Sequence, residues 1–411
     1  MKVGKKAIII TLTIFTIAVT AISLNSGSYG ENTSRYFKSD TSVFYHKHIQ
    51  YSNLAFSYDT FITQAYTQEN IPGLAVVIIK DNQVLFMKPY GVKQFGTTDS
   101  VDMNTVFRLG SVSKGFASVL TGILVDEKKL SWDDKVIKYL PDFTLKDTAY
   151  TNNLTIRNIL SQTSGLPTHT YTEMLDCNVP YEQIKPLLAN VTPIAQPGKL
   201  YSYQNVTYSL IADIVKSATG QDYNTLVEHK IFTPLYMQHA SLDYETMAAD
   251  NNVAWPHVYA ANHQWKLLEL NNRYYSVPPA SGVNASISDM ARWLLALNGN
   301  YPEFIPTESL DEIFTPQIKT PIKRKYRNSW RNLDELYYGL GWRVFDMNGS
   351  RIIYHGGYVK GYRAEIAFNF EEKAGIAVLF NSNCRLSNIC IPKFWELYFS
   401  SIKDNILVAD N

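Results

Sequence analysis

Strand-like segments lie near the two ends of this 411-residue chain and are separated by a long helical stretch, an order that limits the folds open to it. GLAVVIIKDNQVLFMKPYGV at 73–92 gives two β-rich runs around Asp81-Asn82-Gln83, which predicts a hairpin. Near the other end, YYGLGWRVF, RIIYHGG, YRAEIAFNF and GIAVLFNS are typical of successive strands. The order predicts an α+β fold, in which one antiparallel sheet, flanked by helices, is built from both chain ends and carries an inserted, mostly helical region.

The same segments predict the domain organisation. We expect one domain at about 51–403, with its α/β part at about 51–144 and 281–403 and its helical insert at about 145–280. Residues 25–50 are polar and mixed, which predicts a linker. Helical spacing predicts helices at 154–166, at 208–220 with a glycine cap, and at 287–299.

The N-terminus carries an export signal or an anchor. Lys2, Lys5 and Lys6 precede an apolar run without charge at 7–24. The run is either a cleaved signal peptide or a retained membrane anchor, which would attach the protein to a membrane. Both alternatives predict an exported protein, periplasmic or in the cell envelope.

Charge and cysteine content exclude several classes of function. Lys and Arg total 38 against 37 Asp and Glu, and the one short basic run is PIKRKYR at 321–327, so we expect no nucleic-acid partner. A monomer is expected as well, although the sequence carries no signal of oligomeric state. Cys177, Cys384 and Cys390 are too few for a disulfide scaffold and have no metal-ligand spacing. Cys384 and Cys390 are close enough in sequence to pair, and three unpaired thiols are the alternative.

The stretch RLGSVSKGF at 108–116 places Ser111 and Lys114 three residues apart. On a helix these positions share a face, so a neutral Lys114 amine could accept the hydroxyl proton of Ser111 and make a nucleophile. The alternative is that Ser111 only caps an ordinary amphipathic helix. An S-x-x-K pattern arises by chance about once or twice in a chain of this length, and it recurs at Ser400 and Lys403. The pattern alone does not decide whether Ser111 is a nucleophile or a helix cap.

Three segments in one order carry a resemblance: FRLGSVSKGF, YSYQNVTYSLIADIV and YHGGYVKGYRAEIAF. Together with TIRNILSQTSGLP, PGKLYSYQN and PPASGVNASISDMARW, they make the chain resemble the serine beta-lactamase and penicillin-binding protein family. The resemblance is to the branch of class C beta-lactamases, DD-peptidases and related esterases, and it runs from residue 71 to the final strands. It implies a beta-lactamase/transpeptidase-like fold and an acyl-enzyme chemistry without metal or cofactor.

The resemblance assigns the family's motifs to particular residues. They are Ser111 and Lys114 for the first motif, Tyr203-Gln204-Asn205 for the second, and His355-Gly356-Gly357 for the third. Y-x-N also occurs at 51–53 and at 150–152, but only Tyr203 follows PGKLYS and precedes a predicted helix. The third motif is lysine-threonine-glycine in typical class C beta-lactamases, whereas DD-peptidases and esterases of the branch often carry the H-x-G form. Its two glycines let the strand backbone come close to a substrate.

In the mechanism that the resemblance implies, Ser111 attacks a carbonyl and Lys114, kept neutral by burial and nearby positive charge, takes the proton. Tyr203 passes a proton to the leaving nitrogen and later helps to activate water. The backbone NH groups of Ser111 and Tyr358 are expected to hold the oxyanion, and Asn205 to hold the amide side chain of the substrate.

Two histidines are assigned to the substrate side of the site. His355, with Gly356 and Gly357, is expected to line it, and His169 in SGLPTHTY falls near the place where class C enzymes present a polar residue to the substrate's amide. His169 is equally compatible with a surface position. Because histidine is mostly neutral near pH 7, His355 offers a substrate carboxylate, or a Tyr203 phenolate, less stabilisation than a lysine would.

We therefore expect an exported serine acyl-hydrolase that acylates on Ser111 and takes a small molecule or peptide, a beta-lactam or a D-alanyl peptide, as substrate. The change to His355 favours a peptidase or esterase over a fast dedicated beta-lactamase. Two alternatives remain open: an esterase or amidase that acts on small acyl substrates with the same residues, and a penicillin-binding sensor that deacylates slowly.

Overall fold

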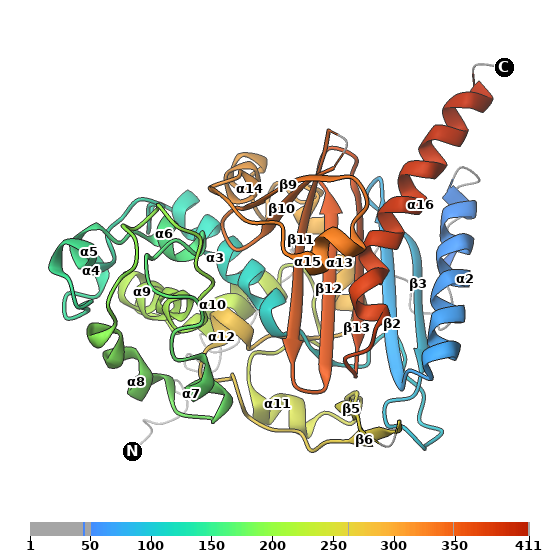
Figure 1. The fold of residues 1–411 in the computed structure, drawn as a ribbon, viewed down its shortest axis with the longest axis horizontal. Coiled ribbons are helices and arrows are strands. Elements are labelled where there is room, and N and C mark those ends of the chain that lie inside the picture. The colour runs from blue at the N-terminus through green and yellow to red at the C-terminus, as the bar shows by residue number, and fades with distance from the viewer. Residues whose placement is uncertain (1–43, 46–50, 262, 348, 410–411) are drawn as a thin grey trace, which may run out of the picture. The chain divides into compact units, whose positions relative to one another are not determined.

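A nine-stranded antiparallel sheet runs through the part of the chain that the structure, a computed structural model, describes: residues 44–45, 51–261, 263–347 and 349–409 (Figure 1). Its spatial order is β1 (Phe44–Tyr45), β3 (Gln83–Gly91), β2 (Gly73–Lys80), β13 (Ala374–Phe380), β12 (Tyr362–Asn369), β11 (Ser350–Val359), β10 (Arg343–Met347), β9 (Leu333–Tyr338) and β8 (Ile318–Lys319). The two chain ends meet where β2 pairs with β13, with Val77 opposite Ala377. The predicted α+β fold with a sheet from both chain ends is confirmed.

The hairpin of β2 and β3 turns at Asp81 and Asn82, where the sequence predicts it. These residues have φ of 47° and 66°, the left-handed backbone that a two-residue hairpin turn requires and that Asp and Asn tolerate. β2 is buried from Gly73 to Ile79. Its apolar run does not alternate because helices cover both faces of the sheet at this strand.

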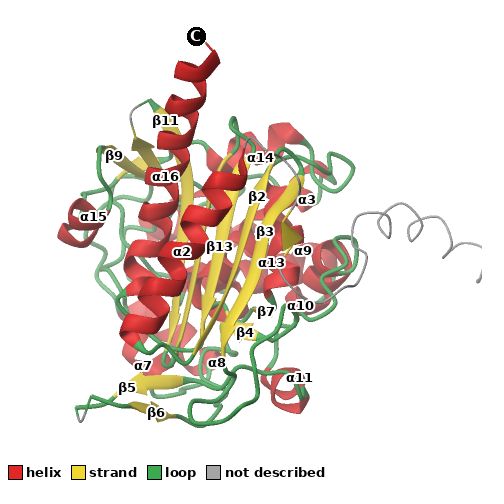
Figure 2. Cartoon of the chain, turned by 90° about the vertical axis from the view of Figure 1, so that its right-hand side faces the viewer, coloured by secondary structure: helices red, strands yellow, loops and turns green. Residues whose placement is uncertain are grey.

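Helices lie on both faces of the sheet (Figure 2). One face is covered by α2 (Ser52–Glu69) and α16 (Leu386–Ala409), and there the Tyr58 hydroxyl donates to the Cys390 carbonyl at 3.0 Å. The other face carries α13 (Ile287–Leu297), α14 (Thr307–Phe314) and α3 (Ser113–Asp126). Phe116 of α3 stacks on Trp293 of α13, with ring centroids 4.0 Å apart. Packed in this way, α3 is buried along nearly its whole length.

The middle of the chain forms short helices, most of them on the side of α3 away from the sheet, with α11 near the lower end of the sheet (Figure 1). They are α4 (Val136–Tyr139), α5 (Thr148–Asn153), α6 (Ile156–Leu160), α7 (Thr172–Asp176), α8 (Tyr181–Ile184), α9 (Leu210–Thr219), α10 (Tyr223–Val227), α11 (Tyr244–Ala249) and α12 (Pro278–Ser281), and α15 (Arg324–Ser329) follows later. Two small sheets pair β4 (Phe107–Arg108) with β7 (Asn284–Ala285), and β5 (His257–Tyr259) with β6 (Trp265–Leu267).

Of two predicted helices, the structure confirms one and shortens the other. The helix predicted at 208–220 ends at Gly220, whose φ is 74°, as expected for a glycine cap. The helix predicted at 154–166 is wrong in length, because only Ile156–Leu160 is helical. The chain reverses at Gln162, which has a φ of 61°.

The N-terminal prediction at 7–24 lies outside the described residues, and within those residues no helix is long and apolar enough to cross a membrane. Of the range predicted as a linker, Phe44 and Tyr45 form β1 and pair with β3. Cys177, Cys384 and Cys390 are free thiols, so the alternative of a bond between Cys384 and Cys390 is wrong.

Two glycines bring β11 against the segment that carries Ser111. A Cβ at Gly357 would lie 1.8 Å from the Leu109 carbonyl oxygen and 3.1 Å from the Ser111 nitrogen. A Cβ at Gly110, whose φ is 53°, would lie 2.7 Å from the Tyr358 nitrogen. Only glycine permits this approach of two backbones, which sets the Ser111 turn beside the end of β11.

We expect Gly357→Ala to lower the free energy of unfolding by about 1–3 kcal/mol, because the new methyl group would meet the Leu109 backbone, which has no side-chain freedom to move aside. Urea denaturation of the purified protein measures this loss. The matched control is Gly220→Asn at the end of α9, where nothing lies within 4 Å and Asn tolerates the positive φ. Equal stability of the Gly357→Ala variant and the wild-type protein would contradict the close approach.

Candidate active site

Ser111 lies in a 3-10 turn, Gly110–Val112, that runs directly into α3. The residues that cap the turn and the helix at their N-termini are Leu109 and Val112, so the structure does not support the alternative in which Ser111 only caps a helix. Ser111 is partly exposed, whereas Lys114, one turn further on, is fully buried. The hydroxyl can therefore meet a substrate while the amine stays out of water.

The amine of Lys114 has three polar neighbours. Its Nζ lies 2.8 Å from Asn205 Oδ1, 2.9 Å from the Ala280 carbonyl oxygen of α12, and 3.4 Å from Ser111 Oγ. A neutral amine has two N–H groups and one lone pair. If Asn205 and Ala280 accept the two N–H groups, the lone pair is left for the Ser111 hydroxyl, which is the arrangement that a general base requires.

The electrostatics of the pocket favour that neutral amine. Burial lowers the pKa of Lys114 well below its ordinary value, and the positive charge of Arg343 lowers it further. The ring of Tyr203 lies 4.7 Å from Nζ and supplies a wall of the pocket. Lys114 is thus held where it can accept a proton from Ser111.

Tyr203 belongs to the Y-x-N segment, which a polar loop holds in place. Gln162 Oε1 accepts from the Gln204 backbone NH at 2.6 Å, and Gln162 Nε2 donates to the Gln204 carbonyl at 3.1 Å. The reversal at Gln162 that shortens the predicted helix therefore supports this segment. Burial raises the pKa of Tyr203, while a hydrogen bond with Ser111 and the charge of Arg343 act in the opposite direction. The structure brings Tyr203, Ser111, Lys114 and Asn205 together.

Arg343 of β10 is a site residue that the sequence analysis missed. Its Nη1 donates to the Tyr201 hydroxyl at 2.9 Å, and its guanidinium carbon lies 5.6 Å from the centroid of the Tyr203 ring. Arg343 supplies a permanent positive charge next to Tyr203. In typical class C beta-lactamases a lysine of the third motif carries such a charge, and here that position is His355. The sequence shows only an arginine inside the apolar strand YYGLGWRVF, just before the third motif, and does not show that it lies beside Tyr203.

The two predicted histidines have different surroundings. His355 is 1% exposed, and its Nε2 lies 3.3 Å from the Tyr338 hydroxyl. His169 has its ring centroid 5.6 Å from that of Tyr203 and donates its backbone NH to the Tyr203 carbonyl at 2.8 Å. Burial lowers the pKa of His169, and so do the charges of Lys323 and two other cations. His169 therefore borders the site as a mostly neutral group, and His355 packs behind its surface.

The third motif supplies the other side of the site. Gly356 faces away from Ser111, because a Cβ there would meet the Tyr354 hydroxyl at 2.7 Å and the Glu365 carboxylate at 2.8 Å. Gly357 faces the Ser111 turn, and the Tyr358 side chain is 51% exposed. The backbone NH groups of Ser111 and Tyr358 thus lie on two segments in direct contact, a geometry suited to holding an oxyanion.

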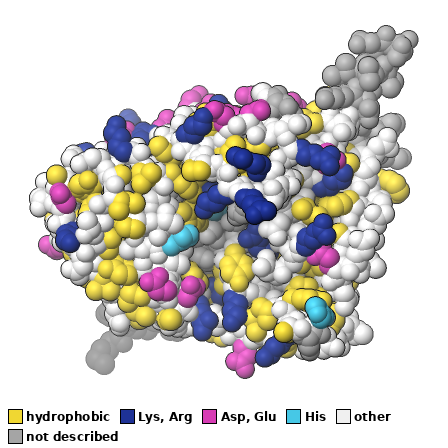
Figure 3. Space-filling view, in the orientation of Figure 1, with side chains coloured by type: hydrophobic (Ala, Val, Ile, Leu, Met, Phe, Trp, Pro, Cys, Tyr) yellow, Lys and Arg dark blue, Asp and Glu magenta, His cyan; other side chains and the backbone are white. Residues whose placement is uncertain are grey.

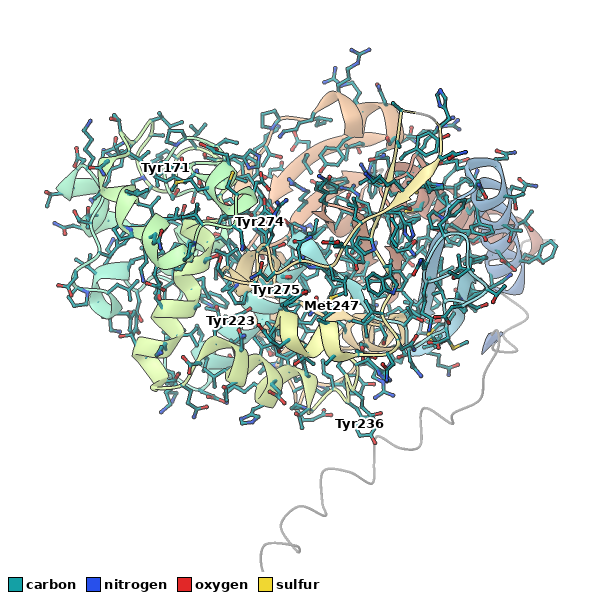
Figure 4. All side chains as sticks on the ribbon, turned by 90° about the horizontal axis from the view of Figure 1, so that it is seen from below. Tyr171, Tyr223, Tyr236, Met247, Tyr274 and Tyr275 are labelled. Atoms are coloured by element: carbon teal, nitrogen blue, oxygen red, sulfur yellow. The ribbon has the colours of Figure 1, made fainter. Side chains whose placement is uncertain are left out.

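Arg108 holds the loop that carries Tyr274 and Tyr275, both of which are labelled in Figure 4. Arg108 is 2% exposed, its Nη1 and Nη2 donate to the Asn271 and Arg273 carbonyls at 3.1 and 2.5 Å, and its guanidinium lies 4.2 Å from the Tyr275 ring centroid. Burial raises the pKa of Tyr274 on this loop, and so do its hydrogen bond with Asp176 and the negative charge that Asp176, Tyr203 and Tyr358 bear when ionised. Tyr274 therefore stands close to the site, and the sequence analysis missed it.

The surface at this junction is hollowed. Figure 3 shows a hollow between the helical region and the sheet, with lysine and arginine side chains around it. Lys323, from the basic run at 321–327, is exposed and near enough to lower the pKa of His169. Within the described ranges, no group of three or more His, Cys, Asp or Glu side chains is placed to hold a metal ion.

Comparison with known proteins gives one family. Residues 58–387 match a family model described as Beta-lactamase. The chain is 27% identical over 340 residues to "Unguisins hydrolase ungD'" of Aspergillus campestris (strain IBT 28561), covering 80% of this chain and 61% of that protein. It is 24% identical over 349 residues to "Protein flp" of Staphylococcus aureus (strain NCTC 8325 / PS 47), covering 82% and 64%. The chain spans less than two thirds of the length of these relatives.

Solved structures share the fold. The octameric penicillin-binding protein homologue from Pyrococcus abyssi superposes with a TM-score of 0.73 at 24% identity, covering 85% of this chain and 77% of that one. A class C beta-lactamase superposes with a TM-score of 0.69 at 21% identity, covering 86% and 98%. The predicted beta-lactamase/transpeptidase-like fold is confirmed by these neighbours.

We expect Arg343→Gln to move the pH dependence of Ser111 reactivity upward by about one pH unit. On the expectation that Lys114 takes the proton of Ser111, Ser111 reacts when Lys114 is neutral, and its reactivity rises with pH through the pKa of Lys114. Arg343 lowers that pKa, so removing its charge raises the pKa and the rising limb shifts to higher pH. The rate at which a fluorophosphonate labels Ser111 across the pH range measures the shift.

The matched control is Arg327→Gln, an exposed arginine on α15. It is expected to leave the rising limb where it is. A rising limb that stays unmoved in Arg343→Gln would show that Arg343 does not tune Lys114.

Proposed function

The chain belongs to the Beta-lactamase family of serine hydrolases, and on that premise we propose that it forms an acyl-enzyme on Ser111 with D-alanyl peptides or beta-lactams. The observation that carries the proposal is the buried amine of Lys114, which lies between Asn205, Ala280 and the Ser111 hydroxyl. A structural lysine would gain nothing from burial without a carboxylate partner, whereas a general base needs a lowered pKa.

The proposed reaction uses two proton carriers. Ser111 Oγ forms a bond with the carbonyl carbon while its proton passes to Lys114 Nζ. The oxyanion accepts hydrogen bonds from the NH groups of Ser111 and Tyr358. When the carbon–nitrogen bond breaks, the leaving nitrogen takes a proton from Tyr203, which recovers one from Lys114. Water then attacks the ester on Ser111 with the same groups acting in reverse, and no metal or cofactor takes part.

Arg343 supports a substrate that carries a carboxylate. D-alanyl peptides and penicillins both have a carboxylate near the bond that breaks, and a guanidinium is a strong partner for it. Arg343 is partly exposed and lies beside Tyr203, so it can face such a group. Arg343 thus supplies a charge that the third motif lacks, because its first residue is here the buried His355 in place of a lysine.

The burial of His355 also favours a second candidate. An esterase or amidase on small acyl substrates needs Ser111, Lys114 and Tyr203 but no lysine in the third motif. A penicillin-binding sensor would use the same residues and deacylate slowly. We place the activity outside the cytoplasm, in the periplasm or cell envelope, because three lysines precede an apolar run at 7–24, and we propose that the protein acts as a monomer without nucleic acid.

The test is to incubate the protein with a penicillin and to follow both intact mass and product release. A covalent adduct that persists supports a DD-peptidase or a sensor, and rapid turnover supports a beta-lactamase. Ester cleavage with no adduct would support the esterase. We expect Ser111→Ala to lower the rate of each of these activities at least about a thousandfold, because the nucleophile is lost.

The chain offers its own control in the second S-x-x-K pattern. Ser400 is exposed on α16, so Ser400→Ala removes a serine from the same pattern without touching the site. It is expected to keep full activity and to form the same adduct. Unchanged activity in Ser111→Ala would overturn the proposed function.

A further inference from the structure

A second cavity, of about 770 Å³, lies between the end of α2, the β5–β6 hairpin and the start of α16. None of the residues placed in the Ser111 site lines it. Its volume falls in the range of about 300–1,000 Å³ that is typical of ligand sites. The family's acyl-transfer chemistry gives this cavity no role.

Aromatic rings form one wall of the cavity. Tyr259 is 54% exposed and Phe95 is 36% exposed. The Tyr259 ring is fixed by Trp265, which meets it edge to face with centroids 5.0 Å apart. Trp265 is itself 9% exposed and donates its Nε1 hydrogen to the Asn70 carbonyl at 2.6 Å, which ties the hairpin to the end of α2. The wall is therefore a rigid, exposed aromatic surface.

Carboxamide side chains line much of the rest. They are Gln68, Asn70, Gln264, Asn383 and Asn388. Each carboxamide offers both donors and an acceptor, as a hydroxyl does. The carboxylate of Glu69 is engaged in capping α16, because its Oε2 accepts from the backbone NH groups of Arg385 and Leu386 at 2.9 and 3.3 Å. The cavity thus joins aromatic faces to five carboxamides, and Arg385 is a further, exposed polar residue of its lining.

We propose that this cavity binds an uncharged oligosaccharide. A sugar ring has an apolar C–H face, which packs on an aromatic ring such as Tyr259, and a rim of hydroxyl groups, which pair with carboxamides in both directions. Most of the polar lining groups are neutral carboxamides, which suit a ligand without charge, and Glu69 and Arg385 supply one charge of each sign. The site is separate from the acyl chemistry at Ser111 and does not depend on the substrate proposed there.

The cavity is tied through the backbone to the strand that faces Ser111. His257 of β5 donates its backbone NH to the Gly361 carbonyl at 3.3 Å, in the turn that joins β11 to β12. The imidazole Nε2 of His257 accepts from the Phe95 backbone NH at 3.0 Å. A saccharide chain held here would be docked at a fixed position relative to the strand that carries Tyr358.

The test is calorimetric titration of the full chain with chitotetraose and, in parallel, with cellotetraose. We expect one of them to bind, and Tyr259→Ala to weaken that binding by at least about tenfold, the loss of a stacked ring. Asn383→Ala should also weaken it while leaving the aromatic wall in place. The matched control is Tyr236→Ala, because Tyr236 is 50% exposed, lies at the edge of the molecule in Figure 4 and does not line the cavity. This variant should bind the saccharide as the wild-type protein does.

Three results with the saccharides and the cavity variants would overturn the proposal, and a fourth, with Ser111→Ala, is given below. The first is that neither saccharide binds, and the second is that Tyr259→Ala binds as well as the control. The third is that a polyproline peptide binds in place of the saccharides and requires Tyr259. Ser111→Ala should bind the saccharide unchanged, so failure of the catalytic proposal and failure of this one are distinguishable. If Ser111→Ala lost saccharide binding, the ligand would occupy the catalytic site, and the second cavity would not be its site.

Discussion

The buried amine of Lys114 is the contact on which the rest of the site depends. Its neighbours come from three separate parts of the chain: Ser111 from the turn before α3, Asn205 from the Y-x-N segment, and Ala280 from α12. A buried amine without a carboxylate is unfavourable as an ion, so burial favours its neutral form. The helix α3 can hold it there because the sheet, α13 and the helical region enclose nearly all of its length.

The positive charge near this amine comes from Arg343 and not from the third motif. His355 stands where typical class C beta-lactamases have a lysine, and it is buried against Tyr338. Arg343, one strand away, brings a permanent charge to Tyr203 and Lys114 instead. The same guanidinium lowers the pKa of Lys114, the base of the proposed mechanism, and in the proposed function it is the partner of a substrate carboxylate. One residue can thus serve both the proton transfer and the choice of substrate.

Features set by local chemistry could be predicted from the sequence. The hairpin at Asp81 and Asn82 follows from strand periodicity and from the tolerance of these residues for positive φ. The grouping of Ser111, Lys114 and Tyr203 could be predicted because motifs in a fixed order are specific even where each is common. Arg343 could not, because its place beside Tyr203 depends on the pairing of Arg343 with Tyr354 across β10 and β11. The register of two paired strands cannot be predicted from a short segment of the sequence.

The most direct test of the account is the pKa of Lys114 in the folded protein. Carbon-13 labelled lysine gives NMR signals that follow the charge of each amine during a pH titration, and the signal that disappears in Lys114→Met identifies the residue. The account predicts that Lys114 loses its proton well below the pH at which the exposed lysines do, because burial and Arg343 both disfavour its charged form. A Lys114 amine that titrates together with the exposed lysines would contradict it.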